Sequence, residues 1–263
     1  MKGKGFIPAT LATLAILMGG VPTGVQAAGY AVFTQGASAL GQGNAVTAHT
    51  DSPNTIFYNP ALIHKLDGTQ VELGTTVIFS SREFETELPG GSTSNQSTFF
   101  PSTFYATHKF NDNLSAGLGV FSPFGLGTKW NEDWEGRYLA TRSKLTSFNI
   151  NPVVSYRIIP SLAVAVGLDV ILVDATLERQ LPGFLFGTTS DVRQKFKGDG
   201  TGVGFNAALA YDLSEEISFG VSYRSEAKVD IKGDASTSLD VTPFDSKGKT
   251  SIRLPQQLTA GVS

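Results

Sequence analysis

Apolar and polar side chains alternate residue by residue along two consecutive stretches of the chain, residues 141–158 and residues 162–177. Successive side chains of a β-strand point to opposite faces, so each stretch predicts a strand with one hydrocarbon face. Strands of soluble sheets usually run about 5–6 residues, whereas a strand that crosses a bilayer needs about 9–11. Because both stretches exceed the soluble length, they predict a hairpin in the wall of a membrane β-barrel. A hairpin in a large soluble β-sandwich is the alternative.

The two faces of these stretches differ in character. The predicted lipid-facing side chains are Phe148, Ile150, Pro152, Val154, Tyr156 and Ile158 in the first stretch and Leu162, Val164, Val166, Leu168, Val170 and Leu172 in the second. The opposite face of the first stretch is polar, but that of the second is apolar apart from Asp169. Since a water-filled barrel has a polar interior, this apolar lining indicates an apolar cargo.

Similar alternation recurs along the rest of the chain and predicts about eight strands. The connections alternate between short turns, near residues 111–113, 159–161 and 214–216, and long polar loops, near residues 82–97, 122–140, 181–199 and 232–248. Short turns on one side and long loops on the other are typical of outer-membrane barrels. The predicted fold class is therefore an all-β, antiparallel transmembrane β-barrel.

The amino terminus predicts export. Lys2 and Lys4 precede an apolar run of about 16 residues, and the small residues before position 28 suit a signal peptidase. We expect a signal peptide at residues 1–27, removed after Ala27. A membrane anchor is the alternative, but the run is short for a spanning helix. Export and a barrel together predict the bacterial outer membrane.

The composition narrows the possible functions and binding sites of the protein. Hydrophobic residues make up 41% of the chain and the mean hydropathy is +0.01, as expected of strands with one apolar and one polar face. The net charge of −3 gives no basic footprint for nucleic acid. The absence of cysteine excludes disulfides, thiolate metal sites and lipid attachment to a new amino terminus. We expect no metal and no cofactor, and a monomer surrounded by outer-membrane lipid.

Residues 28–67 lack the alternation and are rich in small and apolar side chains. They predict a compact plug, or hatch, followed by barrel strands and loops at residues 68–263. The interior of an eight-stranded barrel only just holds its own side chains, so it has no room for about 40 further residues. The last predicted strand also has no partner, and an open edge cannot face lipid. We therefore expect the sequence to be the amino-terminal part of a larger barrel, truncated before closure.

Three motifs, in a fixed order, carry a family resemblance. They are Ala28-Gly29-Tyr30, Asn59-Pro60-Ala61-Leu62, and Pro123-Phe124-Gly125-Leu126 leading to Trp134-Glu135-Gly136-Arg137-Tyr138. With them, the whole chain after the signal peptide resembles the FadL family of long-chain fatty-acid transporters. The resemblance implies a 14-stranded barrel with an amino-terminal hatch, from which a hydrophobic molecule leaves sideways into the membrane through a kinked strand.

Ligand contacts are predicted in the loop after residue 120 and near one arginine. The apolar candidates are Phe124, Leu126, Trp130 and Trp134, although the tryptophans also suit the aromatic girdle at the membrane interface. Arg179 is the first candidate for a carboxylate head group, because the resembled family places a fatty-acid-binding arginine after a similar Ala-x-x-Glu pattern. A guanidinium binds a carboxylate with two parallel hydrogen bonds.

Each cationic candidate for binding the head group also has an alternative role. Arg179 would otherwise pair with Glu178 or with a loop acid. Arg224 and Lys228 share one predicted inner face and are weaker candidates. A salt bridge in the lumen is the alternative for both.

The lateral opening is predicted at Phe121, Ser122, Pro123 and Gly125. Proline cannot donate to a strand ladder and glycine weakens one, so this segment predicts the kink of the resembled family. The start of a loop is the alternative. In the hatch, Asn59, Pro60 and Ala61 are expected to lie against the opening and to gate it.

The predicted function is diffusion-driven uptake of long-chain fatty acids or similar hydrophobic molecules through this channel. A passive structural or adhesion barrel is one alternative, and an outer-membrane lipid hydrolase is another. We do not expect an enzyme, because the histidines, His49, His64 and His108, occur without a catalytic signature. The sequence leaves open whether the cargo is a fatty acid or an aromatic or alkane hydrocarbon.

Overall fold

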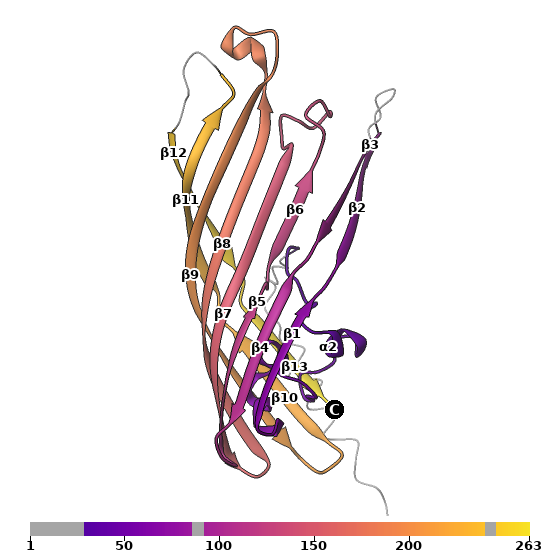
Figure 1. Cartoon of the computed structure of the whole chain (residues 1–263), viewed down its shortest axis with the longest axis vertical. Helices are drawn as coiled ribbons and strands as arrows, with labels where there is room; N and C mark the ends of the chain where they lie inside the picture. Colours follow the sequence, from indigo (N-terminus) through magenta and orange to yellow (C-terminus); the bar gives the residue numbers. More distant parts are fainter. Residues whose placement is uncertain (1–28, 86–91, 240–245) are drawn as a thin grey trace, which may run out of the picture.

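The computed structural model describes residues 29–85, 92–239 and 246–263. The predicted signal peptide lies outside these residues. Within them, thirteen strands make eight passes; eleven strands form one curved antiparallel sheet, here called the wall, and the other two pair only with each other (Figure 1). No helix of the described residues is long and apolar enough to cross a membrane. The predicted all-β class with about eight strands is confirmed.

Three passes are single long strands and five are split in two. The single strands are β7 (Arg142–Ile159), β8 (Leu162–Leu181) and β9 (Val192–Asp212), of 18, 20 and 21 residues. The split passes are β1 (Thr69–Thr75) with β2 (Ile78–Glu85), β3 (Ser92–Phe99) with β4 (Ser102–Lys109), β5 (Leu114–Phe121) with β6 (Gly125–Lys129), β10 (Ser218–Arg224) with β11 (Ala227–Thr237), and β12 (Ser246–Leu254) with β13 (Gln257–Val262).

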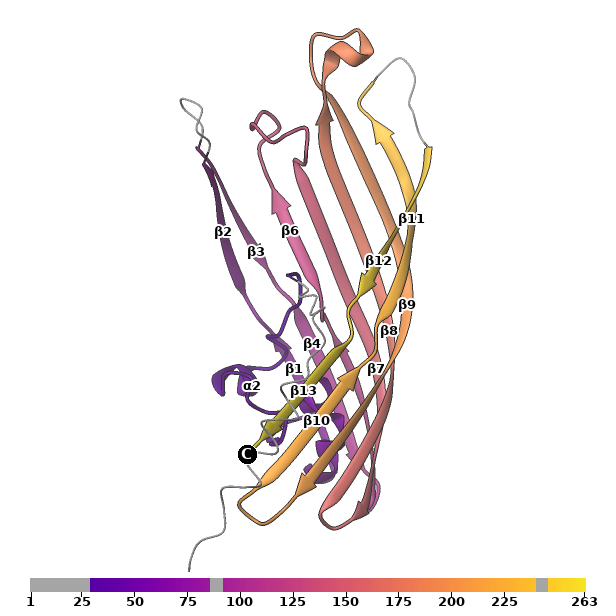
Figure 2. The same cartoon turned by 180° about the vertical axis from the view of Figure 1, so that it is seen from behind.

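The wall is continuous near the short turns and incomplete near the long loops. Hydrogen bonding joins the strands in the order β1-β4-β5-β7-β8-β9-β10-β13. In the other half, β6 pairs with β7, and β11 pairs with both β9 and β12. The hairpin β2–β3 pairs only with itself, and Figure 2 shows it diverging from β6. The wall therefore has no ladder between β3 and β6.

The predicted faces of the two longest alternating stretches are confirmed. On β7, the side chains of Phe148, Ile150, Val154, Tyr156 and Ile158 are exposed, while Ser147, Asn149, Asn151 and Ser155 are fully buried. On β8, Val166, Leu168 and Leu172 are exposed, while Ala163, Ala165, Asp169, Ile171, Val173 and Ala175 are buried. The exposed set forms the hydrocarbon surface that a barrel presents to lipid.

The predicted long loops are partly wrong, because strands continue into them. Residues 82–85 and 92–97 belong to β2 and β3, and residues 125–129 form β6. Residues 192–199 begin β9, and residues 232–237 end β11. These segments are polar, but strand pairing satisfies their backbone groups whatever side chains they carry. A hydropathy pattern alone therefore ends these strands too early.

The seventh pass changes face between β10 and β11. Arg224 is buried at the end of β10, and Ala227 and Val229 are buried in β11. Arg224 and Ala227 are three positions apart and both buried, so the period-two alternation shifts by one at residues 225–226, as at a β-bulge. The prediction that Lys228 shares the inner face of Arg224 is therefore wrong. Lys228 is exposed and pairs with Asp230 at 3.2 Å between Nζ and Oδ1.

Residues 29–68, here called the N-terminal segment, lie against the inner face of the wall (Figure 1). Their helices are α2 (Ala37–Gly41), α3 (Thr55–Tyr58) and the 3₁₀-helix η1 (Pro60–Lys65); a further 3₁₀-helix, η2 (Gly183–Phe186), lies in the loop after β8. In η1, Ala61 and Leu62 pack on the alanines Ala165, Ala208 and Ala210 of the wall. Small wall side chains thus let the η1 backbone approach closely.

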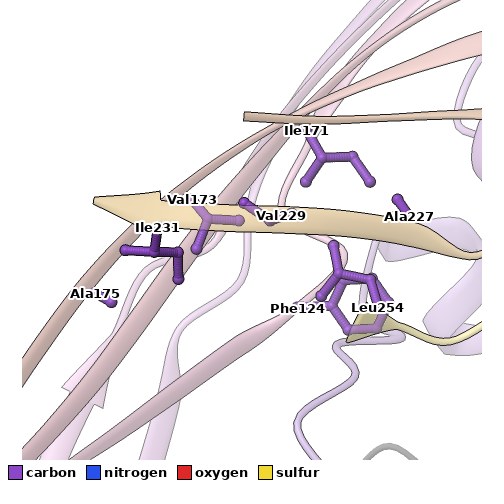
Figure 3. Close-up of a cluster of buried hydrophobic side chains, with 8 residues drawn as sticks. All are labelled: Phe124, Ile171, Val173, Ala175, Ala227, Val229, Ile231 and Leu254. Carbon is purple, nitrogen blue, oxygen red and sulfur yellow. The ribbon is translucent and has the colours of Figure 1, made fainter. Parts of the chain in front are cut away.

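The inner face near the long loops carries an apolar cluster (Figure 3). Its members are Phe124, Ile171, Val173, Ala175, Ala227, Val229, Ile231 and Leu254. Glycines of β9 make room for it, because a Cβ at Gly200 would lie 2.5 Å from the backbone oxygen of Asp230. The predicted apolar lining of β8 is therefore extended by β11, β12 and the end of the third pass.

We expect Gly167→Ala to destabilise the full-length protein by about 1–3 kcal/mol, because it overpacks the inner face of β8. A Cβ at Gly167 would lie 2.6 Å from Val153 Cγ1 and 2.7 Å from Asn206 Oδ1. The matched control is Gly41→Ala, whose Cβ meets no atom within 4 Å. Urea unfolding from lipid vesicles measures both variants, and equal unfolding midpoints would contradict this prediction.

Candidate functional site

The candidate site centres on a break in the third pass of the wall. β5 ends at Phe121 and β6 begins at Gly125, and both strands pair with β7. Phe121 lies opposite Asn149 and Gly125 lies opposite Thr146, so three residues of the break face only two of β7. The extra residue makes the break a bulge, which bends a strand and interrupts its ladder.

Side chains replace the ladder bonds that the break loses. The N–H of Phe124 donates to Ser147 Oγ at 3.1 Å, and this hydroxyl donates to the carbonyl of Phe124 at 2.6 Å. The fully buried Gln35 donates from Nε2 to the carbonyl of Ser122 at 2.8 Å. Pro123 has no N–H that would need a partner. The N–H and carbonyl of Phe124 and the carbonyl of Ser122 therefore have partners without backbone pairing to β7.

The beginning of the N-terminal segment lies along this break. The N–H of Val32 donates to the carbonyl of Pro123 at 2.9 Å, and the N–H of Gly125 donates to the carbonyl of Tyr30 at 2.8 Å. The rings of Tyr30 and Phe124 also pack with their centres 5.5 Å apart. These residues form a short antiparallel contact that adds backbone partners where the strand is interrupted.

A cavity of about 430 Å³ adjoins the break, and we call it the wall cavity. It lies where β3 and β6 share no ladder, between the β2–β3 hairpin, β6 and β7. The lining side chains include Val32, Ile78, Phe99, Phe100, Phe124, Leu126, Leu145 and Phe148. Among them, Phe148 belongs to the lipid-facing set and Phe124 to the inner apolar cluster. The wall cavity therefore reaches from the inner cluster to the lipid-facing side.

The predicted ligand contacts do not form one site. Phe124 and Leu126 line the wall cavity. Trp130 and Trp134 stack on each other beyond the end of β6, with ring centres 4.7 Å apart, and Phe84 meets Trp134 edge-on at 5.4 Å. The indole N–H of Trp134 donates to a backbone carbonyl at 2.9 Å. The tryptophans thus form an aromatic pair near the long loops, away from the wall cavity.

Arg179 lines a separate cavity of about 360 Å³ near the long loops. Its Nε donates to Gln194 Oε1 at 2.7 Å, and it has no ion pair within the part of the chain that the structure describes. Glu178 points to the opposite face, where its Oε1 lies 3.8 Å from Arg142 and 3.6 Å from Lys195. Strand alternation separates neighbouring side chains, so the alternative that Arg179 pairs with Glu178 is wrong.

The residues Asn59, Pro60 and Ala61 do not lie against the break, contrary to expectation. Asn59 donates from Nδ2 to the carbonyls of Thr47 and Leu209, at 2.7 Å and 3.1 Å, and its Oδ1 accepts from the N–H of Ala61 at 3.0 Å. This motif begins η1 and packs on β7, β8 and β9. Small alanines on those strands accept η1, whereas the break is occupied by residues 30–35.

The structure contains a buried polar cluster around Asp169. The sequence indicated it only through the single charge on an otherwise apolar strand face. Asp169 is 1% exposed and accepts hydrogen bonds from Arg224 Nη1, from Asn149 Nδ2 at 2.5 Å and from Asn206 Nδ2 at 3.1 Å. The alternative for Arg224, a salt bridge in the lumen, is therefore confirmed. Two amides and one cation compensate the buried carboxylate, as a charge removed from water requires.

The same arginine joins the N-terminal segment to the break. The guanidinium carbon of Arg224 lies 5.7 Å from the ring centre of Phe57 in α3 and 5.4 Å from that of Phe121. The two rings meet edge-on with centres 5.2 Å apart. Cation–π contact of this kind is worth more when the cation is desolvated. The buried cation of Arg224 thus contacts both α3 and the last residue of β5.

The histidines do not come together. His64 is buried in η1, where its Nδ1 lies 2.7 Å from the carbonyl oxygen of Ala61, and desolvation lowers the pKa of its imidazole. His108 shares a hydrogen bond with Thr69 on the wall. His49 is exposed in the N-terminal segment. Three separate positions offer no shared acid–base chemistry.

We expect Asp169→Asn to cost about 3–5 kcal/mol of stability, because it leaves Arg224 buried without a counter-charge. The double variant Asp169→Asn with Arg224→Met removes both charges and should unfold close to the wild type, since apolar residues often replace buried pairs without loss. Urea unfolding of the full-length protein measures the difference. A double variant as unstable as the single one would contradict this assignment.

Taken together, a wall of long antiparallel strands, a hydrocarbon outer face and an N-terminal segment on the inner face define an outer-membrane β-barrel. A sequence model of the family described as "Outer membrane protein transport protein (OMPP1/FadL/TodX)" matches residues 20–262. The chain belongs to this family.

Individual relatives agree with the family. The chain is 25% identical over 257 residues to the long-chain fatty acid transport protein of Escherichia coli O6:H1, covering 88% of this chain and 57% of that protein. It therefore spans somewhat over half the length of that relative.

Solved structures share the fold. A Pseudomonas aeruginosa FadL homologue superposes with a TM-score of 0.73 at 15% identity, covering 89% of this chain and 66% of the other. The Ralstonia pickettii toluene transporter TbuX gives a TM-score of 0.64 at 20% identity, covering 82% and 65%. Both likenesses show the fold. A further relative, outer membrane protein P1 of Haemophilus influenzae, is 23% identical over 305 residues, covering 97% of this chain and 65% of that protein, and its location agrees with the predicted one.

Proposed function

We propose that the full protein is an outer-membrane channel for diffusion-driven uptake of hydrophobic molecules, which leave it sideways through the wall cavity. The observation that carries the proposal is the break after Phe121, beyond which β6 shares no ladder with β3 and a cavity with a largely apolar lining lies between them. A sealed structural wall would have continuous ladders, because unpaired backbone groups are costly in lipid.

The inner surface supports an apolar cargo. A molecule that entered near the long loops would meet the apolar cluster, first at Ala175, Val173 and Ile171 of β8 and then at Phe124. Phe124 belongs to the cluster and also lines the wall cavity. In this proposal its ring separates the two apolar spaces, and its movement connects them.

The N-terminal segment serves as the hatch in this proposal, through a different part from the one expected. The contact of Tyr30 and Val32 with the break closes the wall from inside. The motif that begins at Asn59 anchors the segment to β7–β9 instead. Cargo that displaces Tyr30 and Val32 would open the break while the anchor stays in place.

Long-chain fatty acids and small hydrocarbons are both candidate cargoes. A similar curated protein is a fatty acid transport protein, and a similar structure is a toluene transporter. Arg179 remains a candidate for a carboxylate near the outer mouth, because the residue is exposed and its side chain bonds only to Gln194 among the described residues. A passive barrel is disfavoured, since it has no use for an interrupted wall beside an apolar cavity.

A disulfide across the break tests the gating. The chain has no cysteine, and Val32 Cγ2 lies 3.6 Å from the Cβ position of Gly125, within reach of a disulfide. We expect oxidised Val32→Cys with Gly125→Cys to take up labelled oleate at least about tenfold more slowly than wild type, because the hatch is tied to the break. Reduction should restore the rate.

The matched control is Ser38→Cys with Asp51→Cys, which closes a bridge inside the N-terminal segment at a hydrogen bond of 2.5 Å between Ser38 Oγ and Asp51 Oδ2. Oxidising it should leave uptake unchanged, because the break stays free. Uptake at the wild-type rate by the oxidised variant Val32→Cys with Gly125→Cys would contradict the proposal.

A further inference from the structure

The wall cavity is lined by positively charged side chains as well as by apolar ones. Two of its lining residues are cationic, Arg82 on β2 and Lys144 on β7. Among the residues that the structure describes, no aspartate or glutamate lines it. Neither cation forms an ion pair within the part of the chain that the structure describes, where ten other ion pairs occur.

The placement of Arg82 follows from strand alternation. Ile78 and Ser80 line the wall cavity with it, so one face of β2 is turned toward the space, and Glu83 and Glu85 belong to the other face. Arg82 is partly buried, and its Nη1 lies 3.3 Å from Ser80 Oγ. That contact occupies one nitrogen of a guanidinium with five N–H donors, which leaves donors for an anion.

Lys144 approaches from the opposite side of the cavity. It stands across from Gly127 in the pairing of β7 with β6. Phe99 fills the space over Gly127, where a Cβ would lie 2.3 Å from its ring. Gly127 and Phe99 also line the cavity. The β2–β3 hairpin and β6 are therefore in contact there through the ring of Phe99 and not through backbone hydrogen bonds. Lys144 is exposed and lines the wall cavity, so its flexible side chain can reach a ligand in this space.

We propose that the wall cavity binds the anionic head group of a single-chain amphiphile, held between Arg82 and Lys144 with its chain on the aromatic lining. The inference rests on the proposed transport and narrows its cargo from hydrophobic molecules in general to those with an acidic head. A volume of about 430 Å³ lies within the roughly 300–1,000 Å³ range of small-molecule sites. A neutral hydrocarbon gains nothing from two cations, whereas a carboxylate forms charge-assisted hydrogen bonds with both.

This site differs from the one predicted at Arg179. The residues that line the two cavities are different, and Arg179 lies near the long loops with Gln194 and Phe196. An acid captured at the mouth through Arg179 would meet a second cationic site, formed by Arg82 and Lys144, where it leaves the wall. Two successive cationic sites separated by an apolar cluster suit an amphiphile that moves head group first.

The test uses 5-doxyl stearic acid, whose nitroxide lies close to the carboxylate, and its uncharged methyl ester. A bimane fluorophore on Thr98→Cys reports the wall cavity, because Thr98 lines it, and one on Ala235→Cys reports the cavity of Arg179. The full-length protein in a non-ionic detergent is titrated with each lipid. We expect quenching at Thr98 by the acid at a concentration at least about tenfold lower than by the ester.

Removing the two cations should abolish this preference. In Arg82→Gln with Lys144→Gln, the acid should quench at Thr98 about tenfold more weakly, while the ester stays unchanged. The matched control is Arg142→Gln with Lys195→Gln, which removes the same charge from residues that pair with Glu178 outside the wall cavity. It should keep the preference, and so should Arg179→Gln at the Thr98 reporter.

Competition identifies the source of the anion. Dodecanoate that displaces the probe at a lower concentration than dodecyl phosphate assigns the site to fatty-acid cargo; the reverse order assigns it to phosphate-bearing membrane lipid, and the anion site stands in both cases. Equal quenching by acid and ester, or an unchanged preference without Arg82 and Lys144, overturns the proposal. Those results leave the uptake function standing, whereas failure of both lipids to quench at either reporter counts against transport itself.

Discussion

The structure depends on the need of every backbone N–H and C=O group in a membrane wall to find a partner. A break in a strand is therefore possible only where other groups supply the lost hydrogen bonds. Here Ser147 serves both backbone groups of Phe124, and Gln35 serves the carbonyl of Ser122. Val32 donates to the carbonyl of Pro123, and the carbonyl of Tyr30 accepts from the N–H of Gly125. The N-terminal segment is thus part of the wall's hydrogen bonding as well as a plug inside it.

This dependence explains why small residues line the inner face. Ala165, Ala208 and Ala210 let η1 rest on the wall, and glycines of β9 let β11 pack over them. The contacts with the alanines fix η1 on the wall. The beginning of the N-terminal segment is held at the break by backbone hydrogen bonds and one aromatic contact. A firm anchor with a more weakly held end is suited to local opening, because regions with few buried contacts open at the lowest free energy.

Sequence patterns predicted the features that depend on local chemistry. Period-two alternation located the long strands and their faces, and Pro123 marked the break because proline lacks a donor. Features set by contacts between distant segments escaped prediction. Nothing local to Asn59 shows that it anchors on β9, and the bulge after Arg224 carries no proline or glycine to reveal the change of face at Lys228. Arg82 and Lys144 likewise meet one cavity only because the hairpin leaves the ladder beside β6.

The most direct test is amide hydrogen exchange at Val32 and Gly125 in the full-length protein, with and without bound oleate. These two N–H groups join the N-terminal segment to the break, whereas the N–H of Leu62 bonds to Asn59 within the anchor. The account predicts that oleate speeds exchange at Val32 and Gly125 by about tenfold or more and leaves Leu62 unchanged. Unchanged exchange at the break while oleate is bound would contradict it.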